Sequence, residues 1–156
     1  MSDAAEPVTG IEVPINLQFR FTAGKALTRF LTQVREGRLV GQRCPSCNNV
    51  YLPPGGMCAR CGVETREEVE VSDEGIIESF TIVHIPIPGN AIKPPFVAAN
   101  IRLDGTDMAC LHRVSEVDNA KVRVGMRVKA VWKPREEWDY TFENIAWFRP
   151  AEGEDA

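Results

Sequence analysis

This sequence of 156 residues lacks the long apolar run that a membrane span requires, since a transmembrane helix needs about 20 consecutive apolar residues. Its first residues, MSDAAEPVTGIEVP, also lack the basic start and apolar core of a secretory signal. We expect residues 1–19 to be a flexible lead and 151–156, AEGEDA, an acidic tail. A cytoplasmic location, in which thiols stay reduced, is therefore the expectation.

The sequence also lacks an excess of positive charge. The net charge is −4, which argues against broad binding to a nucleic-acid backbone. Basic residues are nevertheless concentrated between residues 20 and 43, where Glu36 is the single acidic residue among Arg20, Lys25, Arg29, Arg35, Arg38 and Arg43. This segment is either a solvated helix face or a contact with an acidic partner or an anionic ligand, such as the phosphates of coenzyme A.

No recognisable catalytic motif is present: the chain has no glycine-rich phosphate loop, serine elbow or paired-carboxylate motif. Cys110 and His112 lie two residues apart in a predicted strand, so they would share a face and could form a nucleophile and its base. Lone buried cysteines are commonly inert, however. His84 lies between apolar neighbours and is expected to be structural. The sequence therefore predicts no catalytic residue.

Cysteines, in contrast, form one clear motif. Two Cys-x-x-Cys pairs flank a Pro-Pro-Gly-Gly turn, and each pair can direct both sulfurs at one metal ion. Disulfides are disfavoured by the expected location, and a redox pair would normally lie near a βαβ pattern, which is absent. We predict a zinc ribbon over residues 38–64 whose ligands are Cys44, Cys47, Cys58 and Cys61.

Zinc in such a site is expected to be structural rather than catalytic. A catalytic zinc keeps one position open for water or substrate, whereas four thiolates fill the tetrahedral shell. Asn48 and Gly62 each follow the second cysteine of a pair, and both residue types tolerate the left-handed backbone that such turns use.

A helix is predicted before the ribbon, over residues 23–36 within a helical segment 20–37, with Thr22 as its cap and Gly37 as its stop. Its apolar face consists of Leu27, Phe30, Leu31 and Val34. This face either packs on its own domain or docks on a partner protein. The residues alone leave both alternatives open. They also leave open whether the basic side chains of the helix, Lys25, Arg29 and Arg35, face solvent or contact an anionic ligand.

Short strands separated by turn signals are predicted after the ribbon. Five or six of them over residues 65–150 are typical of a small antiparallel barrel, and an OB-fold fits the size best. The proline-rich loop 85–96 is either a rigid connection or an edge that contacts a ligand or partner. OB-folds also bind single-stranded nucleic acid through exposed aromatics, but most aromatics here fall in core-like strand positions and this half is net acidic.

The order of these parts resembles a family of small zinc-ribbon/OB-fold proteins, known as domain of unknown function thirty-five. The resemblance covers about residues 20–150 and rests on GRLVGQRCPSCNNVYLPPGGMCARCG, SFTIVHIP, PFVAANIRLD, and VGMRVKAVW followed by FRP. It implies a mostly β protein with an N-terminal helix, a rubredoxin-like ribbon and an OB-fold. The zinc ligands of the family correspond to the four paired cysteines.

The resemblance also implies a partner, because members of this family bind thiolase-fold enzymes that act on acyl-CoA thioesters. Some partners are thiolases, and others are lipid-transfer-protein-like aldolases that shorten steroid side chains. The ending EEWDYTFENIAWFRP looks most like the aldolase-partner branch. We therefore expect a non-catalytic accessory subunit in a hetero-oligomer, which helps form the acyl-CoA channel. With such a partner, we expect docking through the apolar face of the helix, which consists of Leu27, Phe30, Leu31 and Val34. We also expect contacts to an anionic ligand from Lys25, Arg29 and Arg35. The alternatives are a single-stranded nucleic-acid-binding module and an enzyme that uses Cys110.

Overall fold

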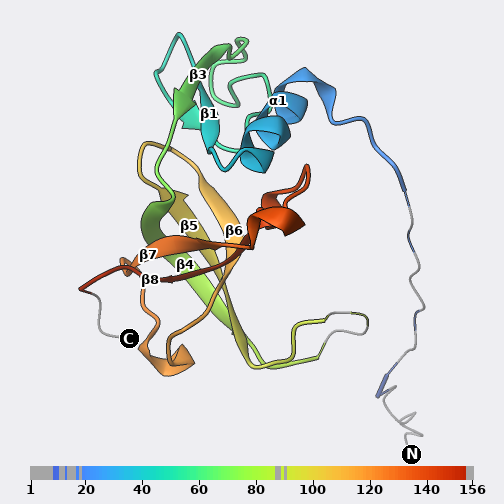
Figure 1. Ribbon diagram of the computed structural model, residues 1–156, viewed down its shortest axis with the longest axis vertical. Coiled ribbons are helices and arrows are strands. Elements are labelled where there is room, and N and C mark those ends of the chain that lie inside the picture. The colour runs from blue at the N-terminus through green and yellow to red at the C-terminus, as the bar shows by residue number, and fades with distance from the viewer. Residues whose placement is uncertain are drawn as a thin grey trace, which may run out of the picture.

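The computed structural model describes residues 9–10, 13, 17, 19–86, 89 and 91–153. Figure 1 shows the helix α1 (Gly24–Arg35) and a small sheet at one end of the molecule, and a β-barrel at the other. The predicted lead and tail lie mostly outside the described residues. Within the described part, no helix is both long and apolar enough to cross a membrane.

Helix α1 forms where the apolar spacing predicted it. It ends in a Schellman motif, in which the N–H of Gly37 donates to the Val34 carbonyl at 3.0 Å and that of Arg38 donates to Gln33 at 2.9 Å. Gly37 has a φ of 82°, which is why a glycine stands at this stop. The predicted cap is wrong: Ala23 occupies the N-cap position, and no side chain caps the helix.

The ribbon contributes a three-stranded antiparallel sheet. Its strands are β1 (Val40–Arg43), β2 (Val50–Tyr51) and β3 (Glu67–Glu70), with β1 in the centre. Residues 67–70 fall within the predicted barrel 65–150, but in the structure they form an edge strand of the ribbon sheet.

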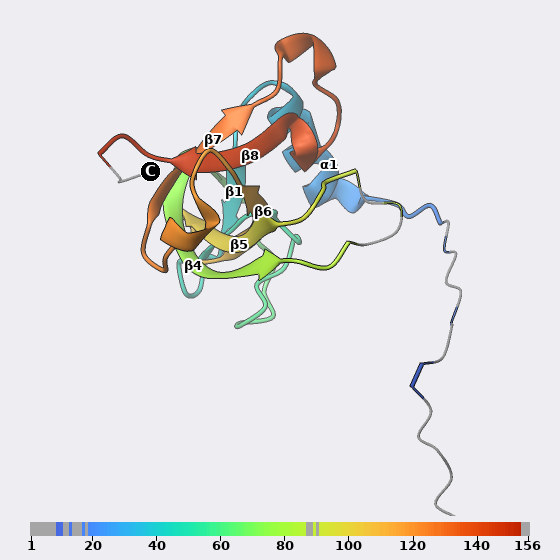
Figure 2. The same cartoon turned by 90° about the horizontal axis from the view of Figure 1, so that it is seen from below.

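Five strands close the barrel: β4 (Glu74–Val83), β5 (Phe96–Leu103), β6 (Ala109–Val114), β7 (Arg127–Trp132) and β8 (Ile145–Pro150). They follow one another in the order β4-β5-β6-β8-β7, and β7 pairs with β4 (Figure 2). All pairings are antiparallel except that of β6 with β8, where Val114 lies opposite Phe148. This is the topology of an OB-fold, which confirms the predicted fold class.

Strand β5 shows why these residues form a barrel. Its buried side chains alternate along the strand, and they are Val97, Ala99, Ile101 and Leu103. Asn100 between them is exposed, as the two-residue period of a strand requires. Gly75 of β4 allows β5 to approach closely, because a Cβ there would lie 2.3 Å from the carbonyl oxygen of Arg102.

Helix, ribbon and barrel share one hydrophobic core. Phe30 and Val34 of α1 and Leu39 and Leu52 of the ribbon are buried in the same cluster as the barrel interior. The β7–β8 connection, residues 133–144, folds back beneath α1 in Figure 1. It carries the short 3-10 helices η2 (Arg135–Glu137) and η3 (Phe142–Asn144). The predicted boundaries 38–64 and 65–150 thus separate two parts that are packed together.

Candidate metal centre and docking surfaces

The four paired cysteines converge as predicted. Their Sγ atoms all lie within 4.8 Å of one another, and those of Cys47 and Cys58 are 3.7 Å apart. Tetrahedral zinc with Zn–S bonds of about 2.3 Å places its sulfurs about 3.8 Å apart. The spacing therefore fits one zinc ion held by four thiolates.

The two cysteine turns have the same backbone design. In the first turn, the N–H of Asn48 donates to the Cys44 carbonyl at 3.0 Å. In the second, the N–H of Gly62 donates to the Cys58 carbonyl at 2.9 Å. Asn48 and Gly62 have φ values of 63° and 67°, which confirms the left-handed conformation expected of them. In addition, the N–H of Cys61 donates to the Cys58 sulfur at 3.3 Å. Such bonds stabilise the charged thiolate form.

Tyr51 adds a contact that the sequence did not reveal. Its hydroxyl lies 3.1 Å from the Cys58 sulfur in a buried setting, and this bond is the strongest of several hydrogen bonds that together lower the pKa of Cys58 to about 6. The same bond raises the pKa of Tyr51. A hydrogen bond from a neighbouring side chain to a metal ligand orients that ligand. No sequence motif indicated this contact, because Tyr51 lies in strand β2, seven residues before Cys58.

Zinc in this site would hold the ribbon together, because its ligands come from two separate turns. Four thiolates leave no position for water or substrate, so the arrangement suits a structural rather than a catalytic ion. Burial agrees with this role: Cys44 and Cys58 are buried, while Cys47 and Cys61 are partly buried.

Cys110 and His112 do share a face of β6, but their surroundings do not favour catalysis. Burial raises the pKa of the Cys110 thiol to about 11, and its sulfur lies 3.5 Å from the Ile101 carbonyl. Burial also lowers the pKa of His112, whose ring packs edge-on against Phe142 and Phe148. Both groups are held in neutral, packed forms. His84, expected to be structural, is exposed beyond the end of β4.

The predicted partner-binding face of α1 divides into two pairs. Phe30 and Val34 are only 2% and 0% exposed, because residues 133–144 cover them from within the chain. The ring of Phe30 lies 5.9 Å from that of Phe142, measured between centroids. The docking prediction is therefore wrong for these two residues. Leu27 and Leu31 are half-buried, and for them partner contact stays a prediction.

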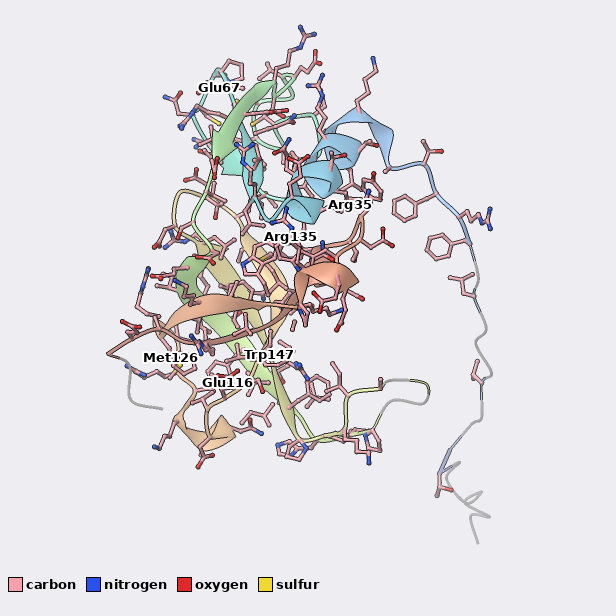
Figure 3. The ribbon with its side chains drawn as sticks, viewed as in Figure 1. Arg35, Glu67, Glu116, Met126, Arg135 and Trp147 are labelled. Carbon is pink, nitrogen blue, oxygen red and sulfur yellow. The ribbon has the colours of Figure 1, made fainter. Side chains whose placement is uncertain are left out.

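Several basic residues near α1 already have partners inside the chain. Arg38 bonds Glu70 at 2.7 Å, and Arg43 bonds Glu67 at 3.2 Å, both across the ribbon sheet. Arg29 lies 3.8 Å from Glu68, in an exposed pair. These three arginines thus face the acidic strand β3, whose Glu67 is labelled in the upper part of Figure 3.

Of the predicted ligand contacts, Arg35 is the most constrained. It donates to the Tyr140 hydroxyl at 2.7 Å and stacks over the same ring at 4.6 Å. Tyr140 belongs to the connection 133–144, so these two contacts join α1 to that connection. Lys25 lines a shallow groove between the start of α1 and the loop Pro54–Met57. The structure does not bring Lys25, Arg29 and Arg35 into one site, and ligand binding by them stays a prediction.

An open cavity of about 590 Å³ lies beside the proline-rich loop. Ile92 of the loop, Leu111 of β6 and Phe142 supply apolar walls, while Arg113 and Lys133 add positive charge. Leu111 is 68% exposed although it lies in a strand. The sequence indicated ligand or partner contact as one alternative for the loop, but it did not predict the cavity, which combines the loop, β6 and the β7–β8 connection from distant parts of the sequence.

Taken together, the fold and the cysteine site define a two-part zinc-ribbon/OB-fold protein. Residues 32–66 match the family model of the ChsH2 rubredoxin-like zinc ribbon domain, and residues 68–133 match that of the ChsH2 C-terminal OB-fold domain. The chain belongs to this family, that of the DUF35 proteins, which confirms the predicted resemblance.

Curated relatives show the same kinship. A "probable enoyl-CoA hydratase alpha subunit" of Thermomonospora curvata is 32% identical over 99 residues, which is 63% of this chain and 30% of that protein. A "DUF35 domain-containing scaffold protein" of Methanocaldococcus jannaschii is 29% identical over 96 residues, or 61% of this chain and 67% of the relative. The chain thus spans under a third of the first of these proteins.

Two solved structures are similar in fold. The chain of the "Ltp2-ChsH2(DUF35) aldolase" is 26% identical with a TM-score of 0.61, and the match covers 84% of this chain and 98% of that one. A DUF35 protein of unknown function from Sulfolobus solfataricus is 23% identical with a TM-score of 0.60, covering 81% and 84%.

Proposed function

We propose that this protein is a non-catalytic accessory subunit that binds an acyl-CoA enzyme of the thiolase fold, a retro-aldolase or a thiolase. The observation that carries the proposal is the likeness to the DUF35 chain of an aldolase complex, which extends over 98% of that chain. The scaffold name of several relatives supports the same role. A steroid side chain is the substrate we favour.

The chemistry of the described residues is consistent with this role. The one metal-ligating cysteine cluster has a complete set of four ligands. Cys110, the remaining cysteine, is buried with a raised pKa, and His112 packs between rings. An enzyme subunit elsewhere in the complex would therefore supply the catalytic groups.

The apolar cavity beside loop 85–96 is our candidate for this chain's share of an acyl-CoA channel. Its walls can contact an apolar acyl or pantetheine chain, and Arg113 and Lys133 can attract phosphates. In this proposal the enzyme subunit covers Leu111 and closes the open side. Arg113 is partly held already, because its guanidinium lies 5.1 Å from the Trp147 ring centroid.

The decisive experiment is co-expression of this chain with a candidate thiolase-fold acyl-CoA enzyme from the same genome, with an affinity tag on only one of them. We expect capture in equal amounts, as in a two-plus-two hetero-oligomer. We also expect acyl-CoA turnover when both chains are present and none from this chain alone. Turnover by this chain alone, after removal of any contaminating enzyme, would contradict the proposal.

A further inference from the structure

Residues 11–21, IEVPINLQFRF, carry an apolar side chain at every odd position and a polar residue or proline at every even one; we call them the alternating segment. Every odd position is apolar: Ile11, Val13, Ile15, Leu17, Phe19 and Phe21. A two-residue period of this kind is the pattern of a strand with one apolar face. β-branched and aromatic residues at these positions add to the strand preference.

The apolar side chains of the alternating segment that the structure describes are all exposed. Val13, Leu17, Phe19 and Phe21 are between 68% and 75% exposed. The rings of Phe19 and Phe21 lie 6.4 Å apart between centroids, as expected for neighbours on one face of an extended chain. One exposed apolar residue is ordinary, but four exposed at odd-numbered positions of one short segment favour burial against a partner.

The described sheets of this chain offer no place for such a strand. The barrel is closed, and the ribbon sheet has edges of only two residues in β2 and four in β3. The β3 edge is also acidic, with Glu67 and Glu70 bonded to arginines of the ribbon. A second copy would present the same closed barrel and short edges. An open edge long enough for this segment must then come from a different protein, unless two alternating segments pair with each other, an outcome that the test below distinguishes.

We propose that the alternating segment adds as a β-strand to an open sheet edge of the partner enzyme, with its apolar face against that subunit. The identity of the partner, though not the strand pattern, rests on the function proposed above. The segment ends at Phe21, just before α1 begins at Gly24. In Figures 1 and 2 the described residues before α1 lead away from the body of the molecule.

Pro14 sets which edge of the strand is paired. In a strand, the N–H and C=O groups of even-numbered residues point to one edge and those of odd-numbered residues to the other. A proline, which lacks an N–H, is tolerated at the edge that faces solvent. Pro14 is at an even position, so the even-numbered N–H groups face away from the partner. The odd-numbered backbone groups then form the ladder. At about 3.3 Å per residue, the segment can reach about 35 Å along the enzyme surface.

The test compares three forms of the full-length chain for binding to the purified thiolase-like enzyme. The double variant Leu17→Ser/Phe19→Ser removes apolar side chains, while the matched control Asn16→Ser/Gln18→Ser changes the polar positions only. Because Leu17 and Phe19 are exposed, zinc content and melting temperature should match the wild type. We expect the apolar variant to bind at least about tenfold more weakly and the control to stay within about twofold.

A second variant, Gln18→Pro, tests the pairing side, because it removes an even-numbered N–H and is expected to leave binding unchanged. Equal affinity of the wild type and the Leu17→Ser/Phe19→Ser variant would overturn the strand proposal while leaving the proposed function intact. Failure of the wild-type chain to bind would instead overturn the proposed function and the partner assigned here. Loss of a wild-type self-association in the apolar variant would show that two segments pair with each other, which also contradicts the proposal.

Discussion

Replacing Phe30 with alanine tests whether α1 is part of the protein's own core. Phe30 is 2% exposed and lies in the cluster that joins α1 to the barrel, where its ring contacts that of Phe142. Truncation of a fully buried phenylalanine costs about 3–5 kcal/mol, because it removes apolar burial and leaves a cavity. At about 2–4 °C per kcal/mol for a chain of this size, the melting temperature should fall by about 6–20 °C.

The free energy of unfolding can be measured by urea denaturation of the zinc-loaded protein, followed by circular dichroism. Leu111→Ala is the matched control, since it also removes an apolar side chain but one that is 68% exposed. Its effect should stay within about 0.5 kcal/mol. Both variants should retain full zinc, because neither side chain contacts the cysteine cluster.

A cost below about 1 kcal/mol for Phe30→Ala would refute the reasoning. It would mean that α1 is detached from the barrel in solution and that its apolar face is free. The original docking interpretation of Phe30 and Val34 would then return.

The remaining predictions concern the thiols and one close backbone contact. Cys58→Ser should lower zinc content in metal analysis and destabilise the ribbon, because metal binding is coupled to folding, whereas Cys110→Ser should keep its zinc. Tyr51→Phe removes the hydroxyl 3.1 Å from the Cys58 sulfur and should weaken zinc affinity about 10- to 100-fold in a chelator competition; unchanged affinity would show that this bond does not support the ligand. With its pKa raised to about 11, Cys110 should react with iodoacetamide at pH 8 roughly 100-fold more slowly than an ordinary thiol, and its rate should increase as the pH rises. Peptide mass spectrometry would follow the labelling, and fast labelling of Cys110 at pH 8 would contradict this prediction. Gly75→Ala should destabilise the barrel by about 1–3 kcal/mol in the same urea assay, because the added Cβ meets backbone of β5.

The parts that the sequence predicted well depend on local patterns. The apolar spacing of α1 and the left-handed turn positions at Asn48 and Gly62 are local signals, and the structure confirms them. The zinc ligands followed from cysteine spacing, since the metal itself requires four convergent sulfurs. Alternating burial along β5 likewise follows from the strand period.

What the sequence missed depends on contacts between distant segments. Trp138 follows three charged residues in the sequence, yet it is half-buried, and its ring lies 5.3 Å from that of Trp132 between centroids. This packing belongs to the β7–β8 connection that covers Phe30. No local pattern near Phe30 reveals that a segment more than 100 residues later folds back on it. The Tyr51 contact with Cys58 was missed for the same kind of reason.

The shared core has a consequence for any attempt to divide this protein. A cut between residues 66 and 68, where the two family matches meet, would expose Leu39 and Leu52 on one fragment and the barrel interior on the other. Neither fragment should then express well alone, and exchanging one ribbon for another should require matching changes in the β7–β8 connection. The two parts are therefore expected to have diverged together, as one inherited unit.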